Sequence, residues 1–343
     1  MMTIGLTYDL RSEYIALGYN EDETAEFDQV ETIFAIENSL KHLGLKTDRI
    51  GNAEQLIKKL VQGCRWDMVF NIAEGLYGFG REALVPSLLD AYKIPYTFSD
   101  PMVLGLTLHK AMTKHVIRDL GIPTPDFALV ETQDDIQQVS LSFPLFAKPV
   151  SEGTGKGISS KSKITCREDL YTVCTQLLHD FRQPVLIERF LPGREFTAGI
   201  LKTGKEAEVI GIMEIFLKDK NDDIAYSLHN KEHYEHFVEY RLVDDMTAER
   251  AKKIALAAWR GLGCRDAGRI DLRMDNQGVP NFIEVNPLAG IRPGHSDLCI
   301  LCDFVGISYT EMIAAIVDSA MKRAKKEMWP GNQKRLGEYQ IAS

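Results

Sequence analysis

The sequence predicts a mixed α/β and α+β fold, with a parallel-sheet domain first and two further lobes after it. Three observations support this prediction. Short apolar runs alternate with amphipathic segments over roughly the first hundred residues, which is typical of β-α units. A strand, a glycine-rich loop, a helix and another strand follow them. Nearer the C-terminus, two alternating segments flank a short turn, which is a hairpin pattern.

The first unit is expected to cover residues 1–105. Its expected strands and helices alternate along the chain: Thr3–Tyr8, Thr24–Leu43, Lys46–Ile50, Ala53–Val61, Met68–Ile72 and Arg81–Ala91. Thr24 is the expected N-cap of the first helix, and Gly44 is its expected stop. Repeated β-α units of this kind predict a parallel sheet that helices cover on both faces.

The second unit, residues 106–187, is expected to be a small α+β lobe. Its first helix runs from Leu106 through Leu120, after which a proline pair breaks the chain. The other expected elements are Phe127–Val130, Asp134–Val139, Leu145–Val150 and Glu168–His179. The third unit is expected to cover residues 188–329 and to contain the hairpin, with a loosely held tail at residues 330–343.

The composition argues against nucleic acid and membranes as partners. The 343 residues carry a formal net charge of -9, whereas non-specific phosphate binders are normally basic. The apolar runs are far shorter than the roughly 20 residues that cross a bilayer, and Met1–Leu10 lacks the basic start of a signal peptide. We therefore expect a cytosolic protein with six free thiols. Redox or metal chemistry at Cys299 and Cys302 is the alternative for that pair.

The most informative segment is the hairpin at residues 268–287, which reads GRIDLRMDNQGVPNFIEVNP. If its DNQG turn is symmetric, Asp271 lies opposite Phe282, and Arg269 lies opposite Glu284. One face of the hairpin then carries Arg269, Asp271, Glu284 and Asn286. The opposite face, which suits a core, carries Ile270, Leu272, Ile283 and Val285.

The polar face of this hairpin suits a metal ion beside phosphate. Two carboxylates and an amide are hard oxygen donors that would repel one another without a cation, and Mg²⁺ shared with phosphate oxygens fits them. Arg269 beside them could neutralise charge on a transferring phosphate or a tetrahedral oxyanion. The alternative is a surface hairpin with solvated charges and an Arg–Glu ion pair.

A second group of residues suits a nucleotide. Lys148 ends an apolar run beside the loop SEGTGKG at residues 151–157, whose glycines let backbone N–H groups approach phosphate. Downstream, VLIERFLPGREF places Glu188 and Glu195 around an apolar segment that could hold adenine and ribose. A plain surface turn and ordinary charged strand ends are the alternatives.

Taken in order, Lys110, AKPVSEGTGKG, LIERFLPGREF, GRIDLRMD, FIEVNP and PGHSD resemble the ATP-grasp superfamily, most closely its D-alanine–D-alanine ligase branch. The resemblance implies a Rossmann-like pre-ATP-grasp domain followed by two ATP-grasp lobes that clamp ATP between antiparallel sheets. It implies two Mg²⁺ ions, with Mn²⁺ as a substitute, held by Asp271, Glu284 and Asn286. The implied ATP contacts are Lys110, Lys148, Ser151, Thr154, Gly155, Glu188, Leu191 and Glu195.

The resemblance also implies catalytic roles. Arg269 would stabilise an acyl phosphate and the intermediate that follows it. Lys231 matches a lysine on the family's active-site loop, and Ser296, after His295, matches a serine beside the carboxylate of the second substrate. A helix N-cap is the alternative for His295 and Ser296.

The substrate end departs from the pattern of D-alanine ligases. Tyr8–Glu26 forms a longer, acidic connection where those ligases have a glycine-rich turn, and Asn71–Glu74 with GLYGFGREA replaces a His-Gly loop. For Arg81 and Glu82, an ion pair at a helix start is the alternative to a substrate role. The candidate substrate contacts are Glu26, Glu74, Arg81, Glu82, Arg292 and His295.

These features predict an ATP-dependent carboxylate–amine ligase that joins two amino acids or amino-acid-like metabolites through an acyl phosphate. The expected partners are small-molecule carboxylates and amines, with neither nucleic acid nor membrane, and the resembled branch implies a homodimer. A different acceptor, such as the end of a peptide, would keep this chemistry. The alternatives from other classes are an ATP-grasp kinase and a nucleotide-binding regulator that does not catalyse.

Overall fold

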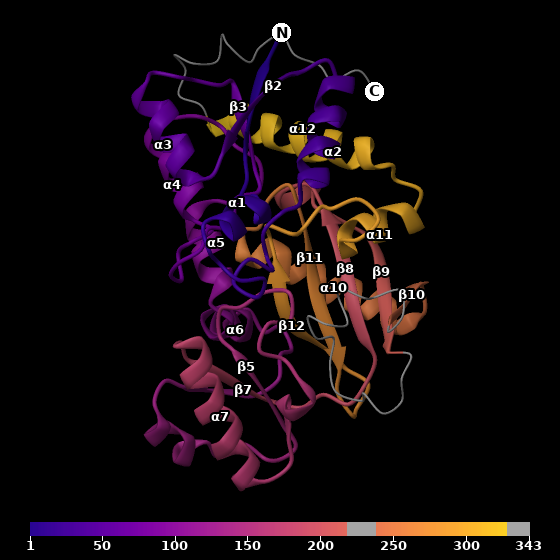
Figure 1. Ribbon diagram of the computed structural model, residues 1–343. Coiled ribbons are helices and arrows are strands. Elements are labelled where there is room, and N and C mark those ends of the chain that lie inside the picture. The colour runs from indigo at the N-terminus through magenta and orange to yellow at the C-terminus, as the bar shows by residue number, and fades with distance from the viewer. Residues whose placement is uncertain (218–237, 328–343) are drawn as a thin grey trace.

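The N-terminal region contains a three-stranded parallel sheet in the computed structural model, which describes residues 1–217 and 238–327 (Figure 1). Its strands, in sheet order, are β2 (Lys46–Gly51), β1 (Thr3–Thr7) and β3 (Met68–Asn71). One face packs against α2 (Val30–His42) and α12 (Tyr309–Glu327), and the other against α3 (Ala53–Val61) and α4 (Leu84–Ala91). The prediction of a parallel sheet covered on both faces is confirmed.

The segment between β1 and α2 differs from the prediction. It contains a short helix, α1 (Arg11–Ala16), with no buried residue, so it gives no apolar period in the sequence. Thr24 does not cap α2, because its hydroxyl donates to the carbonyl of Asn20 within a turn. Helix α2 begins six residues later, at Val30, after N-cap Gln29.

The helix expected at Leu106–Leu120 is two helices, α5 (Pro101–Leu108) and α6 (Lys110–Asp119). They separate at His109, whose backbone is extended and whose ring accepts the N–H of Met112. The break makes Lys110 the first residue of α6. Its N–H donates to the carbonyl of Val150 at 3.0 Å, which fixes the start of α6 against the end of a strand.

The small lobe is a four-stranded antiparallel sheet packed against α7 (Arg167–Phe181). Its strands, in sheet order, are β4 (Phe127–Val130), β7 (Val185–Arg189), β5 (Leu145–Pro149) and β6 (Lys163–Ile164). Leu170, Cys174 and Leu177 of α7 pack on one face. Leu186 of β7 packs on the other face, against Ala111 of α6.

The large lobe is a five-stranded antiparallel sheet. Its strands, in sheet order, are β10 (Val238–Val243), β9 (Glu208–Leu217), β8 (Glu195–Leu201), β11 (Ala267–Met274) and β12 (Pro280–Asn286). Helix α10 (Met246–Leu262) covers one face through Trp259 and a row of alanines. Helix α11 (Asp297–Phe304) packs on the other face, against Met213 of β9.

The predicted register of the β11–β12 hairpin is wrong by two residues beside the polar face. Asp271 pairs with Glu284, and Arg269 pairs with Asn286. Met274 pairs with Pro280, so the loop has five residues, and Asp275 stabilises it by accepting the N–H of Gln277 and of Val279.

The five-residue loop shifts the register by one residue from the prediction, and a β-bulge shifts it by one more. At the bulge, Leu272 pairs with Phe282 and Asp271 with Glu284, so Ile283 has no partner in the ladder. An even total shift leaves the predicted polar residues on one face. The bulge turns Ile283 toward that face, where it lines a cleft, and Phe282 takes the expected core position.

All six cysteines are free. Cys299 and Cys302 are buried in α11, and burial raises the pKa of Cys302 to about 12. In the described part of the chain, no one helix has the length and apolarity to span a membrane, although α11 and α12 pass that test as a pair bent by 111°.

Candidate functional site

The two antiparallel sheets face each other across a cleft of about 880 Å³. Lys148 of β5 and Glu188 of β7 line it from the small lobe, and Asp271 of β11 and Glu284 of β12 line it from the large lobe. The predicted site residues that line this cleft are Lys110, Lys148, Gly155, Glu188, Leu191, Glu195, Arg269, Asp271 and Glu284.

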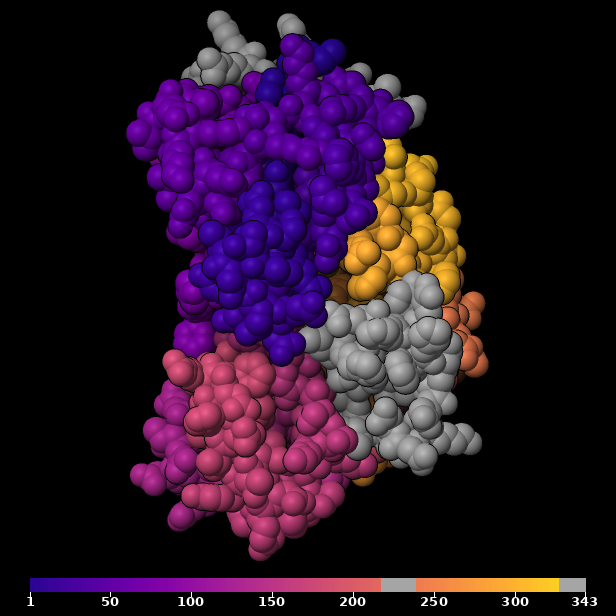
Figure 2. All heavy atoms as spheres, viewed as in Figure 1, coloured from indigo at the N-terminus to yellow at the C-terminus, as the bar shows by residue number. Residues whose placement is uncertain are grey.

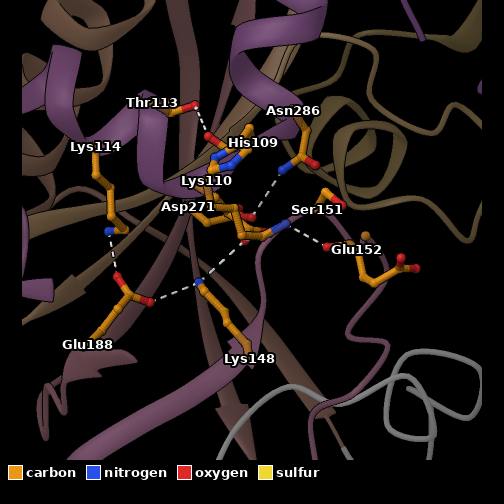
Figure 3. A network of polar contacts seen from close by, with 12 residues as sticks. His109, Lys110, Thr113, Lys114, Lys148, Ser151, Glu152, Glu188, Asp271 and Asn286 are labelled. Atoms are coloured by element: carbon orange, nitrogen blue, oxygen red, sulfur yellow. Dashed lines mark hydrogen bonds and ion pairs between the residues drawn. The ribbon is translucent and has the colours of Figure 1, made fainter. Parts of the chain in front are cut away.

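Glu188 lies between two buried lysines (Figure 3). Its carboxylate oxygens are 3.0 Å from Lys148 Nζ and 2.6 Å from Lys114 Nζ. Burial lowers the pKa of Lys114 to about 8. Burial acts on Lys148 in the same direction, but the attraction of Glu188 and Glu284 outweighs it and raises the pKa of Lys148. Glu188 therefore holds a charged lysine in place at position 148.

Lys110 and Lys148 both approach Glu284. Their Nζ atoms lie 3.9 and 3.7 Å from Glu284 Oε2, which is beyond hydrogen-bonding distance. Lys110 Nζ instead donates to the carbonyl of Glu152 in the glycine-rich loop at 2.5 Å. Two lysines near one carboxylate form a net positive region that suits phosphate oxygens.

The three candidate magnesium ligands lie on one face, as the sequence predicts. Asp271 and Glu284 are directly opposed, and Asn286 Nδ2 lies 3.4 Å from Asp271 Oδ2. Carboxylate and amide oxygens are donors that Mg²⁺ prefers, so this donor set fits the ion. Over residues 1–217 and 238–327, no three His, Cys, Asp or Glu side chains form a metal-binding group. Phosphate oxygens and the Asn286 amide would have to complete the coordination.

Arg269 is held by two carboxylates. Its Nη1 lies 2.8 Å from Asp271 Oδ2 and 3.0 Å from Asp297 Oδ2. Asp297 is buried at the start of α11 and also accepts the Tyr240 hydroxyl at 3.2 Å. Arg269 lines both the cleft and a second cavity, so it stands where the two spaces meet.

The second cavity lies between residues 11–32 and the loop before α11. The predicted residues that line it are Glu26, Thr154, Arg269, Arg292, His295 and Ser296. Thr154 thus lies in this cavity rather than in the cleft. Ser296 occupies the N-cap position of α11, but its hydroxyl accepts the N–H of Arg292 and no helix N–H. Among the described residues, no carboxylate pairs with Arg292.

Glu26, in the acidic connection at residues 8–26, binds the glycine-rich loop at residues 151–157. In Figure 2, the indigo N-terminal residues reach the magenta small lobe. Glu26 Oε2 lies 3.0 Å from Arg81 Nη2, and Glu26 Oε1 accepts the N–H of Gly153 at 2.5 Å. Arg81 also donates to the carbonyl of Ser151. The protein itself therefore occupies both oxygens of Glu26, and Arg81 pairs with Glu26 rather than with Glu82.

The remaining predicted residues lie elsewhere. Glu74 and Glu82 line neither space, and burial with nearby negative charge raises the pKa of Glu74. Burial raises the pKa of Glu82 to about 7 against the opposing effect of Arg81. The Ser151 hydroxyl donates to Gln183 at 2.7 Å, away from the cleft. Lys231 is outside the described residues.

The charged residues Lys114 and Asp297, which contact predicted site residues, were not predicted themselves. Lys114 follows Lys110 by one helical turn in α6. The two lysines therefore share a helix face, and this spacing could have predicted that Lys114 lies near the site. Asp297 directly follows Ser296, but its contact with Arg269 depends on how α11 packs on the sheet, which local sequence does not encode.

Comparisons with known proteins agree with this geometry. The family model described as D-ala D-ala ligase C-terminus matches residues 116–318. A D-alanine–D-alanine ligase from Bordetella avium is 33% identical over 247 residues, 71% of this chain and 75% of that protein. An uncharacterized protein, y4sG, from Sinorhizobium fredii is 31% identical over 265 residues, 75% of each chain.

A crystal structure of another protein has a similar fold. The crystal structure of D-alanine–D-alanine ligase from Bacillus anthracis complexed with ATP matches with a TM-score of 0.72 at 21% identity, and covers 96% of this chain and 100% of that chain. The structural match supports the ATP-grasp fold, while the family model and the curated relatives support the enzyme class. The chain therefore belongs to the D-ala D-ala ligase C-terminus family and is an ATP-dependent ligase of the ATP-grasp type.

Proposed function

We propose that this ligase joins the carboxylate of one amino acid, or a similar metabolite, to the amine of another beside Arg269. The observation that carries the proposal is that Arg269 lines both the cleft and the second cavity. D-alanine is the substrate that the names of the relatives suggest. The acidic connection at residues 8–26 favours at least one different substrate, as does Arg292, which forms no ion pair with the carboxylates that the structure describes.

The cleft residues would bind the nucleotide. Lys110 and Lys148 would hold phosphate oxygens, the backbone at Gly155 would close over them, and Leu191 with Glu195 would line the adenosine end. Asp271, Glu284 and Asn286 would hold two Mg²⁺ ions, which Mn²⁺ could replace. When bound, the ions would neutralise charge between the β- and γ-phosphates.

The reaction then needs no side-chain nucleophile. A carboxylate oxygen attacks the γ-phosphorus and ADP leaves, and the amine next attacks the acyl carbon and phosphate leaves. Arg269, held by Asp271 and Asp297, would stabilise the negative charge of both steps. Arg292 and Ser296 would bind the carboxylate that remains on the second substrate, and we assign Lys231 to the same reaction.

The test is phosphate release with ATP and Mg²⁺ against pairs of amino acids, followed by the mass of the product. Turnover that requires both a carboxylate and an amine, with a product one water lighter than the pair, supports the proposal. A phosphorylated hydroxyl would indicate a kinase, and ATP binding without turnover would indicate a regulator.

Glu284→Gln tests the metal assignment. We expect turnover to fall by at least about 100-fold, because the amide is a weaker ligand for the cation that the phosphates require. Phosphate release at several Mg²⁺ concentrations measures the loss. Glu249→Gln, an exposed position on α10, is the control. Unchanged turnover and Mg²⁺ dependence in Glu284→Gln would contradict the assignment.

Location and assembly are further proposals. Six free thiols support a reducing compartment such as the cytoplasm, which cell fractionation would test. We also propose a homodimer, which sedimentation equilibrium would detect.

A further inference from the structure

One arginine in the cleft, Arg273, pairs with the carboxylate of a predicted nucleotide contact. Arg273 of β11 and Glu195 of β8 are opposite each other in the large-lobe sheet, and both line the cleft. Arg273 Nη1 lies 3.1 Å from Glu195 Oε2. Within residues 1–217 and 238–327, Glu195 Oε1 accepts no hydrogen bond. The ion pair therefore holds the carboxylate by one oxygen and leaves the other oxygen open to a ligand.

The Arg273 side chain is itself held in place. Its guanidinium carbon lies 5.2 Å from the centre of the Phe190 ring, and Lys163 Nζ lies 4.6 Å from the same centre. In the part of the chain that the structure describes, no second carboxylate pairs with Arg273, and its buried Nε forms no hydrogen bond. The aromatic ring and the Glu195 carboxylate therefore orient the guanidinium.

The position of this pair along the cleft suits the sugar of a nucleotide. Asp271, a candidate magnesium ligand, is two residues before Arg273 on the same strand, and two residues of a strand span roughly 7 Å. On its other side, Arg273 contacts Phe190, which belongs to the apolar lining of the cleft. The ribose of a nucleotide lies between its phosphates and its base, and its hydroxyls are donors for a carboxylate such as that of Glu195.

We propose that Arg273 is a positioning residue that makes the enzyme select the ribose of ATP through Glu195. This inference rests on the proposed function. The side chain of Glu195 is 26% exposed, and such a carboxylate rotates readily toward water unless a partner holds it. The ion pair keeps it directed into the cleft, so the ribose hydroxyls meet an acceptor that loses little side-chain freedom on binding.

The experiment compares ATP with 2′,3′-dideoxyATP, which lacks both ribose hydroxyls. Isothermal titration in the presence of Mg²⁺ measures the binding of each nucleotide without any amino acid. The wild type should bind ATP about 10- to 100-fold more tightly, because the hydroxyls donate charge-assisted hydrogen bonds. In Arg273→Met this ratio should fall by about 5- to 10-fold, because Glu195 loses its preorganised direction. Arg273→Lys, which keeps the positive charge, should recover part of the ratio.

Arg241→Met is the matched control. Arg241 also pairs with a glutamate, Glu239, and its guanidinium carbon lies 4.5 Å from the centre of the Phe216 ring in the same sheet. It is exposed and does not line the cleft, so its replacement should keep the wild-type ratio. Glu195→Gln should lower the ratio, and adding Arg273→Met should lower it no further, because both changes act through one carboxylate.

The outcomes separate the two proposals. A merely structural role of Arg273 would weaken the binding of both nucleotides equally and leave the ratio unchanged. If an amino acid pair turns over but Arg273→Met keeps the wild-type ratio, the role of Arg273 is wrong and the ligase assignment stands. If the ratio depends on Arg273 but no pair turns over, the proposed function fails and the role of Arg273 stands. Equal affinity of the wild type for both nucleotides would overturn the inference.

Discussion

At the scale of single residues, ion pairs between buried charges hold the side chains of the site in place. Lys114 and Lys148 share Glu188, and Arg269 is matched by Asp271 and Asp297. These paired charges fix the geometry of the site before the substrates arrive.

A double-mutant cycle tests the role of Lys114. Lys114→Met and Glu188→Gln should each destabilise the protein by about 2 kcal/mol, because each leaves a buried charge without one partner. Together they should cost less than the sum, by about 1–3 kcal/mol. Urea unfolding measures all four proteins.

The cycle also has a pH dependence with a definite sign. Lys114 has a pKa lowered to about 8, so it loses its positive charge as pH rises through that value. The measured coupling should therefore be present at pH 6.5 and shrink by pH 9. A coupling that stays constant over this range would show that Lys114 acts by packing rather than by charge.

At the scale of elements, the hairpin of β11 and β12 shows what local sequence could predict. Its alternation predicted which residues share a face, and Asp271 and Glu284 meet across the strands. The register depended on a five-residue loop and on the bulge at Ile283. Bulges follow from how a strand twists against its neighbours, so alternation alone does not reveal them.

Gly268→Ala tests the packing beneath this hairpin. A Cβ there would lie 2.5 Å from the Asn286 carbonyl oxygen and 2.7 Å from the Trp259 ring. We expect a loss of about 2–3 kcal/mol and a weaker response to Mg²⁺, because Asn286 must move. Urea unfolding and Mg²⁺ titration measure these effects. Gly105→Ala, where a Cβ meets nothing within 4 Å, should not lower stability.

For the helices, too, local sequence patterns predicted some boundaries and missed others. Helix α3 and the stop of α2 were predicted well because apolar spacing and Gly44 signal them locally. Helix α1 buries nothing, and the break at His109 interrupts an otherwise continuous apolar pattern. Sequence therefore predicted the cleft residues on strands better than the lining of the second cavity, which comes from irregular segments.

At the scale of the whole molecule, a buried ion pair joins distant parts of the chain. Asp266 has no exposed surface and lies 2.8 Å from Arg323 of α12. It also accepts the N–H of Phe98 and the hydroxyl of Thr203. This single carboxylate thus connects the C-terminal helix, the N-terminal region and the large lobe.

Arg323→Met should lower the free energy of unfolding by about 3–5 kcal/mol, because it leaves Asp266 buried without its cation. Lys322→Met, at the neighbouring exposed position, removes only surface ion pairs with Asp318 and Glu206 and should cost less than about 1 kcal/mol. Urea unfolding compares them. Equal losses would contradict a special role for the Asp266 contact.

The packing of α12 on α2 also has a consequence for synthesis. The apolar side of the first sheet is completed by residues of the last described helix, including Met312 and Ile316. While the ribosome is still translating the middle of the chain, α2 is the helix that covers that side, and the surface that α12 will cover is exposed to other hydrophobic surfaces. The nascent chain is therefore prone to aggregation until α12 leaves the exit tunnel.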